Sequence, residues 1–253
     1  MQWIDWNSFA DAMPDTWLLI AAALIGWLAA FPLARIARQL PQALFESWAQ
    51  ADDIEEALSE DREQSTPCQA LRGWRFMAFA MGPVAIAALA LLQHGLQLET
   101  VAICVLGWTL WVLAWIDVET RLLPDVLTLG LLWLGLLLNC AELFASLDHA
   151  VIGAAAGYSS LWLLNAGYRI WRGHDGMGAG DFKLLAAVGA WLGLTALPAV
   201  VLIAAASGVF TGLSLSLIGW RKPGETIAFG PHLCLGAALM VFAEDRLRPL
   251  LFP

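Results

Sequence analysis

Long stretches without a charged residue are the feature that most limits what this chain can fold into. A helix needs about 20 predominantly apolar residues to cross a bilayer. Runs near that length, free of Asp, Glu, Lys and Arg, recur along most of the sequence. They are Thr16–Ala34, Phe76–Leu98, Thr100–Ile116, Val126–Ala141, His149–Tyr168, Leu184–Trp220 and Thr226–Ala243.

One of these runs, Leu184–Trp220, is too long for a single crossing. Gly193 and Pro198 lie within it, and both residue types interrupt helices. We therefore divide the run near residues 195–198, which brings the expected number of transmembrane helices to about eight. An open sheet is excluded because its lipid-exposed edge would leave backbone groups without hydrogen-bond partners. The predicted fold is an all-α, polytopic membrane helix bundle.

The composition excludes several other classes of protein. Sixty per cent of the residues are hydrophobic and 14% are charged, whereas soluble domains are nearer half apolar and a quarter charged. The net charge of −9 provides no basic surface for a nucleic acid. The expected partner of most of this surface is therefore the lipid bilayer.

The basic residues predict the orientation and the domain plan. With the amino terminus outside, 11 of the 13 Lys and Arg residues fall in inner loops, and only Arg246 and Arg248 lie outside. We expect an outer segment at 1–15, two helices and an acidic cytoplasmic loop (35–74) within 16–99, and a six-helix domain at 100–253. The expected protein is therefore a multi-pass membrane protein with its amino terminus outside the cytoplasm.

Two acidic residues stand at joints between an apolar run and an inner loop. Asp117 ends the third run and Asp181 precedes the sixth. An ionisable group at membrane depth is costly and is therefore a candidate functional residue. An ordinary boundary charge is the alternative for each of them, and Asp181 could instead cap its helix.

Short motifs surround both residues. Gly178 and Gly180 precede Asp181, and glycine permits a positive φ and close backbone approach. Pro124 and Asp125 suit a helix start, where a proline and an acidic side chain are both favoured. The role of a helix start explains Pro124 and Asp125 without any function, but it does not explain Asp117.

Taken together, these motifs resemble the type IV prepilin peptidases, aspartic peptidases of the GxGD intramembrane class. The resemblance covers about residues 100–243 and implies that Asp117 and Asp181 form a catalytic pair. Gly178, Gly180, Lys183, Pro124 and Asp125 are then expected to support the motif and the substrate groove. The segments that carry the resemblance are Ile116–Asp117, Leu123–Asp125, Gly178–Lys183, Leu131–Leu136, Lys183–Trp191 and Phe229–Pro231.

The amino-terminal third departs from this family. Many members have two CxxC pairs in the first inner loop, thought to bind zinc, and a second activity that methylates the new amino terminus with S-adenosylmethionine. Here Cys68 is the only cysteine in that loop. We therefore expect no metal site and no cofactor for proteolysis, while methylation with S-adenosylmethionine is left open.

The resemblance implies prepilins or type II secretion pseudopilins as substrates, cut at the cytoplasmic membrane face. Three alternatives were weighed. A presenilin-like GxGD protease would have Tyr-Asp where this chain has Ile116-Asp117. A proton-coupled transporter would favour acids at mid-membrane and two related halves. A non-catalytic assembly subunit would not need both aspartates.

Overall fold

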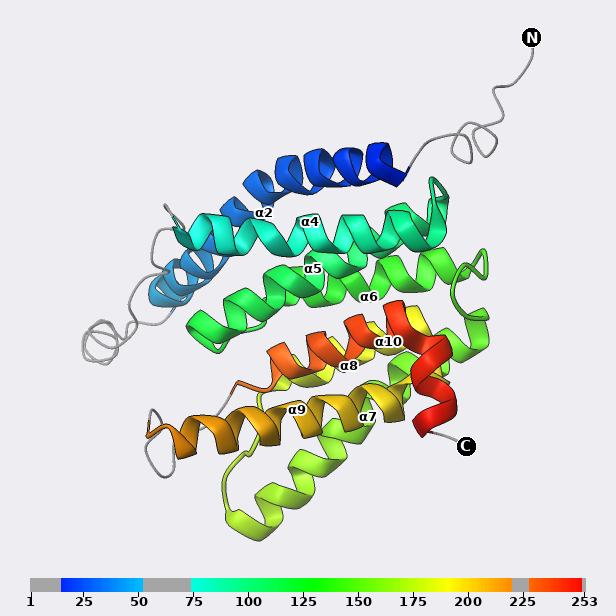
Figure 1. Cartoon of the computed structure of the whole chain (residues 1–253). Helices are drawn as coiled ribbons and strands as arrows, with labels where there is room; N and C mark the ends of the chain where they lie inside the picture. The colour runs from blue at the N-terminus through cyan, green and yellow to red at the C-terminus, as the bar shows by residue number, and fades with distance from the viewer. Residues whose placement is uncertain (1–14, 52–73, 220–227, 252–253) are drawn as a thin grey trace. The chain divides into compact units, whose positions relative to one another are not determined.

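The computed structural model describes residues 15–51, 74–219 and 228–251, and the secondary structure of these segments is helical (Figure 1). This confirms the predicted all-α fold. The described helices are α2 (Asp15–Ala51), α4 (Trp74–His94), α5 (Leu98–Thr120), α6 (Asp125–Asn139), α7 (Leu147–Arg172), α8 (Ala179–Leu192), the short 3₁₀ helix η1 (Leu194–Ala196), α9 (Leu197–Leu217) and α10 (Gly230–Leu251).

Among the described residues, four segments are long and apolar enough to cross a bilayer. The helices Asp125–Asn139 and Gly230–Ala243 are shorter but also apolar. The structure therefore agrees with a multi-pass membrane protein. That all eight predicted helices cross the bilayer stays a prediction. The four segments are Leu18–Phe45, Trp74–His94, Leu98–Thr120 and Leu194–Leu217.

The long apolar run divides where the sequence predicts. Gly193, with φ of 76°, ends α8, and α9 begins at Leu197 with Pro198 in its first turn. By contrast, α2 continues as helix beyond its apolar run as far as Ala51. The cluster of acidic residues between 52 and 63 lies outside the described residues, as do residues 1–14.

The chain divides into two compact units, Met1–Val112 and Leu113–Pro253. In the first unit α4 packs against α2, and the indole groups of Trp108 and Trp111 on α5 donate to backbone carbonyls of α4. Pro83 has no N–H to donate to the carbonyl of Phe79, four residues earlier in α4. The indole Nε1 of Trp111 donates to that carbonyl instead, at 3.0 Å.

In the second unit α8 is the central helix. Almost every side chain from Asp181 to Trp191 is buried, and α6 and α7 both pack against this helix. A Cβ on Gly153 would lie 2.6 Å from the carbonyl oxygen of Gly189, and one on Gly157 would lie 2.6 Å from that of Leu185. These two glycines of α7 therefore allow the α7 and α8 backbones to touch, as small residues four apart do in membrane helices.

Candidate active site

Both candidate aspartates lie in the second unit and are buried. Asp117 belongs to the last turn of α5 and is 5% exposed, and Asp181 belongs to the first turn of α8 and is 7% exposed. Carboxylates are almost never this deeply buried without a partner or a function.

The structure brings the two carboxylates together. Their charges interact electrostatically. The buried thiol of Cys234 on α10 also interacts electrostatically with both of them. The ends of α5, α8 and α10 thus converge on one buried acidic pair. Its catalytic role stays a prediction from the sequence motifs.

Gly230 is the residue that most closely approaches the pair. Its backbone N–H donates to the carboxylate of Asp117. A Cβ on Gly230 would lie 2.5 Å from Asp117 Oδ2 and 3.2 Å from Leu123 Cδ1. Oδ2 is itself buried, and no hydrogen-bond partner for it lies among the described residues. One face of the Asp117 carboxyl group is therefore held by α10, while this oxygen is left to bind something else.

We expect Gly230→Ala to reduce turnover by about 10- to 100-fold, because misplacement of a catalytic group by about 1 Å has effects of this size. The added methyl group would displace the Asp117 carboxyl group. Initial rates of substrate cleavage in detergent would measure this. Gly167→Ala is the matched control, since a Cβ at Gly167 meets no atom within 4 Å. Equal rates for the two variants would contradict the proposed contact.

The glycines before Asp181 serve different purposes. A Cβ on Gly180 would lie 2.7 Å from Leu123 Cβ, so glycine is required there by close approach. Gly178 is the N-cap of α8 with φ of −73°, which any residue can adopt, and its Cβ would meet nothing closer than 4.0 Å. The backbone N–H of Gly178 donates to the carboxylate of Asp181, three residues later. Asp181 therefore helps to cap α8 through this hydrogen bond, and the same side chain interacts electrostatically with Asp117.

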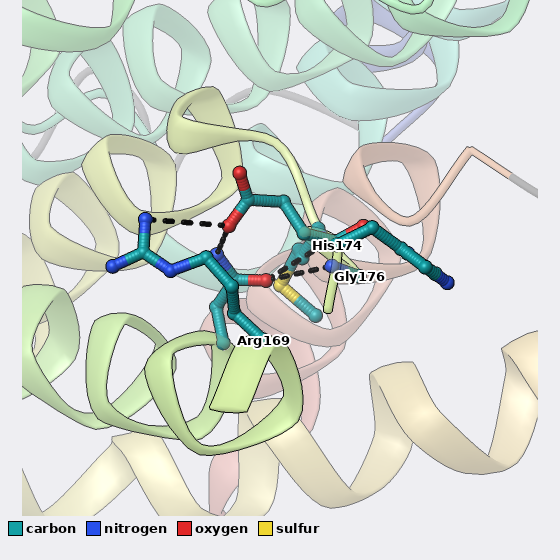
Figure 2. Close-up of polar contacts among 6 residues, drawn as sticks. Arg169, His174 and Gly176 are labelled. Atoms are coloured by element: carbon teal, nitrogen blue, oxygen red, sulfur yellow. Dashed lines mark hydrogen bonds and ion pairs between the residues drawn. The ribbon is translucent and has the colours of Figure 1, made fainter. Parts of the chain in front are cut away.

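A polar cluster on α7 fixes the loop that leads into α8 (Figure 2). Asn165 Oδ1 accepts the backbone N–H groups of Gly176 at 2.9 Å and Met177 at 3.1 Å, and its Nδ2 donates to Asp175 at 2.9 Å. Arg169 lies 3.9 Å from the same aspartate. Asn165 was not singled out from the sequence, because this role depends on the path of a loop that returns against α7.

Comparison with known proteins places the chain in a family. The family model described as "Type IV leader peptidase family" matches residues 104–213. A "Prepilin leader peptidase/N-methyltransferase" of Dickeya chrysanthemi is 36% identical over 275 residues, which cover 93% of this chain and 96% of that protein. The chain belongs to the type IV leader peptidase family.

Two further proteins of the same name show how the similarity is distributed. The protein from Neisseria gonorrhoeae is 38% identical over 73% of this chain and 63% of its own length. The one from Aeromonas hydrophila is 47% identical, over 58% of this chain and only 51% of its own length. The chain therefore aligns with about half of that relative. The comparison of this chain with solved structures found no match.

Lys183 forms an ion pair with Asp125 in this chain. Lys183 Nζ donates to both carboxylate oxygens of Asp125 at 2.7 Å. Asp125 opens α6 directly after Pro124, which is the N-cap, so the predicted helix start is where the sequence places it. The ion pair joins the first turns of α6 and α8 beside the acidic pair. Asp125 therefore has a structural partner in addition to its expected role in the substrate groove.

We expect the variants Lys183→Ala and Asp125→Ala each to lower stability by about 0.5–1 kcal/mol, the range of partly exposed ion pairs. Thermal unfolding of both single variants and the double variant in detergent would give the coupling energy of the pair. If Asp125 also binds substrate, its removal raises KM even when Lys183 is already alanine. An unchanged KM in that background would restrict Asp125 to the ion pair.

The described residues contain no cluster of potential metal ligands. Within the described segments no three His, Cys, Asp or Glu side chains converge as metal ligands. The described free cysteines, Cys104, Cys140 and Cys234, are not paired as CxxC. Cys68 and residues 52–73 of the loop that holds the CxxC pairs in many relatives lie outside the described residues, so the expected absence of a metal site stays a prediction.

Proposed function

We propose that this chain is an aspartic endopeptidase that removes the leader of type IV prepilins or type II secretion pseudopilins. The observation that carries the proposal is the buried, interacting pair Asp117 and Asp181. The names of the relatives supply the substrate class, since they are called prepilin leader peptidases. We place the reaction at the cytoplasmic face of a bacterial inner membrane, because this orientation follows the basic inner loops.

The proposed reaction needs only the two carboxyl groups and water. Two like charges at close range disfavour simultaneous ionisation, so the pair holds one proton. The ionised carboxylate removes a proton from water, whose oxygen attacks the scissile carbonyl carbon. The protonated carboxyl group donates a hydrogen bond to the carbonyl oxygen. Collapse of the tetrahedral intermediate then breaks the C–N bond, and the leaving amine takes up a proton.

The surroundings of Asp117 support this chemistry. Its Oδ2 is buried and has no hydrogen-bond partner among the described residues. Gly230 orients the same carboxyl group through its backbone N–H. This oxygen is thus available for the water or the scissile carbonyl, in a site where burial strengthens electrostatic interactions.

The deciding experiment is incubation of the purified protein with a full-length prepilin in detergent, followed by mass spectrometry of the product. We expect a product shortened at a single bond. Addition of a chelator is expected to leave the rate unchanged, because the proposed reaction uses no metal. An intact prepilin after incubation with a folded enzyme would overturn the proposal.

Methylation is a separate proposal, because the relatives' names include it. With S-adenosylmethionine in the same assay, a mature product heavier by about 14 mass units would demonstrate the transfer of a methyl group.

The alternative of a proton-coupled transporter is less well supported. Both aspartates lie at helix ends, and transporters favour acids near mid-membrane within broken helices. Two results together would favour that alternative. The protein would fail to cleave prepilin, and proteoliposomes that contain it would take up a solute in a proton-dependent way.

A further inference from the structure

The loop between α7 and α8 is held against the last turns of α7 by three hydrogen bonds of one side chain. Asn165 Oδ1 accepts the backbone N–H groups of Gly176 and Met177, and Nδ2 donates to Asp175 Oδ1, all at 2.9–3.1 Å. The guanidinium group of Arg169 lies 3.9 Å from the same oxygen of Asp175 (Figure 2). Three consecutive loop residues therefore take their positions from one asparagine.

Two further features keep this loop close to α7. Gly173 ends α7 in the left-handed region, with φ of 81°, and its N–H donates to the carbonyl of Arg169 at 2.8 Å. A glycine in this conformation reverses the chain directly after a helix. A Cβ on Gly176 would lie 2.7 Å from Cδ1 of Tyr168, so the loop backbone lies against that ring. The loop therefore folds back onto the helix that it leaves.

The loop leads directly into the cap of α8. Gly178, the residue after Met177, is the N-cap of this helix. Its N–H donates to the carboxylate of Asp181, and its carbonyl accepts the N–H of Asp181 at 3.2 Å. Such reciprocal hydrogen bonds fix the first turn of a helix together with the side chain at its third position. The orientation of the Asp181 carboxyl group therefore depends on where Asn165 places the preceding peptide groups.

The helix that carries Asn165 is itself fixed relative to α8. Gly153 and Gly157 of α7 bring the two backbones into contact. Asn165 lies about two helical turns beyond Gly157 on the same helix. A supporting side chain on a packed helix holds its partner more accurately than one on a loop. The same helix thus fixes the register of α8 and the loop that caps it.

We propose that Asn165 is a positioning residue of the peptidase, which holds the loop before Gly178 so that the Asp181 carboxyl group is correctly oriented within the acidic pair. The inference rests on the proposed peptidase function, and it adds a residue that does not touch the reacting atoms. Most hydrogen bonds of Asn165 are exposed, so water replaces them at little cost in stability. Water does not hold the loop in one place, and Asn165 is therefore expected to affect turnover more than folding.

Three variants test this role in the prepilin cleavage assay. We expect Asn165→Ala to lower kcat about tenfold at an unchanged KM, because misplacing a catalytic group by about 1 Å costs about 100-fold and the loop keeps its other contacts. Exchanging the two partners, Asn165→Asp with Asp175→Asn, keeps the donor, the acceptors and the net charge, so kcat is expected to stay within about threefold. Ser159→Ala removes only a hydrogen bond within α7 and is expected to stay within about twofold.

The outcomes separate this inference from the proposed function. If the unchanged protein does not cleave prepilin, the proposed function fails. If it does and Asn165→Ala keeps kcat, or changes only KM, the inference on Asn165 alone fails. Equal losses of kcat in Asn165→Ala and in the exchanged variant would also overturn it. A melting temperature of Asn165→Ala below the assay temperature would overturn it by assigning the lost turnover to unfolding.

A second measurement needs no substrate. Hydrogen exchange of the backbone amides in detergent is followed by mass spectrometry of peptides. In Asn165→Ala we expect at least about threefold faster exchange in the peptide that contains Gly176, Met177 and Gly178, because a local opening is no longer opposed by the asparagine. Peptides from α6 are expected to exchange as in the unchanged protein. Unchanged exchange of the loop would overturn the inference, since the loop would then keep its place without Asn165.

Discussion

Replacing Asp117 or Asp181 with asparagine is expected to reduce the rate of prepilin cleavage by about 10²- to 10⁴-fold, the range contributed by a positioned general acid or base. Asparagine has nearly the same size as aspartate but neither accepts the proton of water nor donates a carboxyl proton. Both side chains are buried and interact with one another. Each single substitution therefore removes the shared-proton pair as a whole.

The double variant provides the sharper control. Because the two carboxyl groups act as a unit, Asp117→Asn with Asp181→Asn is expected to be scarcely slower than either single variant. Independent contributions would instead multiply. Initial rates measured by mass spectrometry, with melting temperatures for each variant, separate the two cases. Near-normal cleavage by either single variant would show that the pair is not catalytic.

A substitution far from the carboxylates is expected to have the largest effect on stability. Asn139 at the end of α6 is 0% exposed. Its Nδ2 donates to the carbonyls of Ala190 and Trp191 at 2.9 Å each, and its Oδ1 accepts from the backbone N–H groups of Phe144 and Ala145. The two carbonyls lie in the last turn of α8, where they have no partner within the helix. Asn139→Leu leaves all four groups without this partner, at an expected cost of about 3–5 kcal/mol.

The matched control for this variant is Asn165→Ala. Asn165 also makes hydrogen bonds to a loop, but most of them are exposed, so water replaces the lost partner. We expect Asn165→Ala to cost about 1 kcal/mol or less. Thermal unfolding of both variants in the same detergent would measure the difference. Similar melting temperatures for the two variants would contradict the interpretation of Asn139 as a buried helix cap.

The local features of the fold are the ones that the sequence predicts well. The division of the long apolar run follows from Gly193 and Pro198, because each acts on the backbone within a few residues of itself. The start of α6 at Asp125 follows equally from its proline and its acidic residue. The two candidate aspartates could be proposed because each stands inside a motif at a helix end.

Other parts of the site depend on packing between segments distant in sequence. Gly230 touches Asp117 only because α10 packs beside the end of α5. The segment Phe229–Pro231 contributes to the family resemblance, but it does not predict this contact. Trp191 illustrates the same limit. Tryptophan side chains favour the membrane–water boundary. Trp191 is instead completely buried, and its indole Nε1 donates to the carbonyl of Leu131 at 2.8 Å.

The backbone contact between α7 and α8 has a consequence for the energetics of the reaction. Side chains that separate helices can change rotamer, but at Gly153 and Gly157 the main-chain atoms of the two helices meet directly. Main-chain atoms have no such freedom, so the register of α8, and with it the height of Asp181, is fixed before any ligand arrives. In the proposed reaction, a carboxylate held in this way is preorganised, so little reorganisation energy would be needed when charge develops on the peptide.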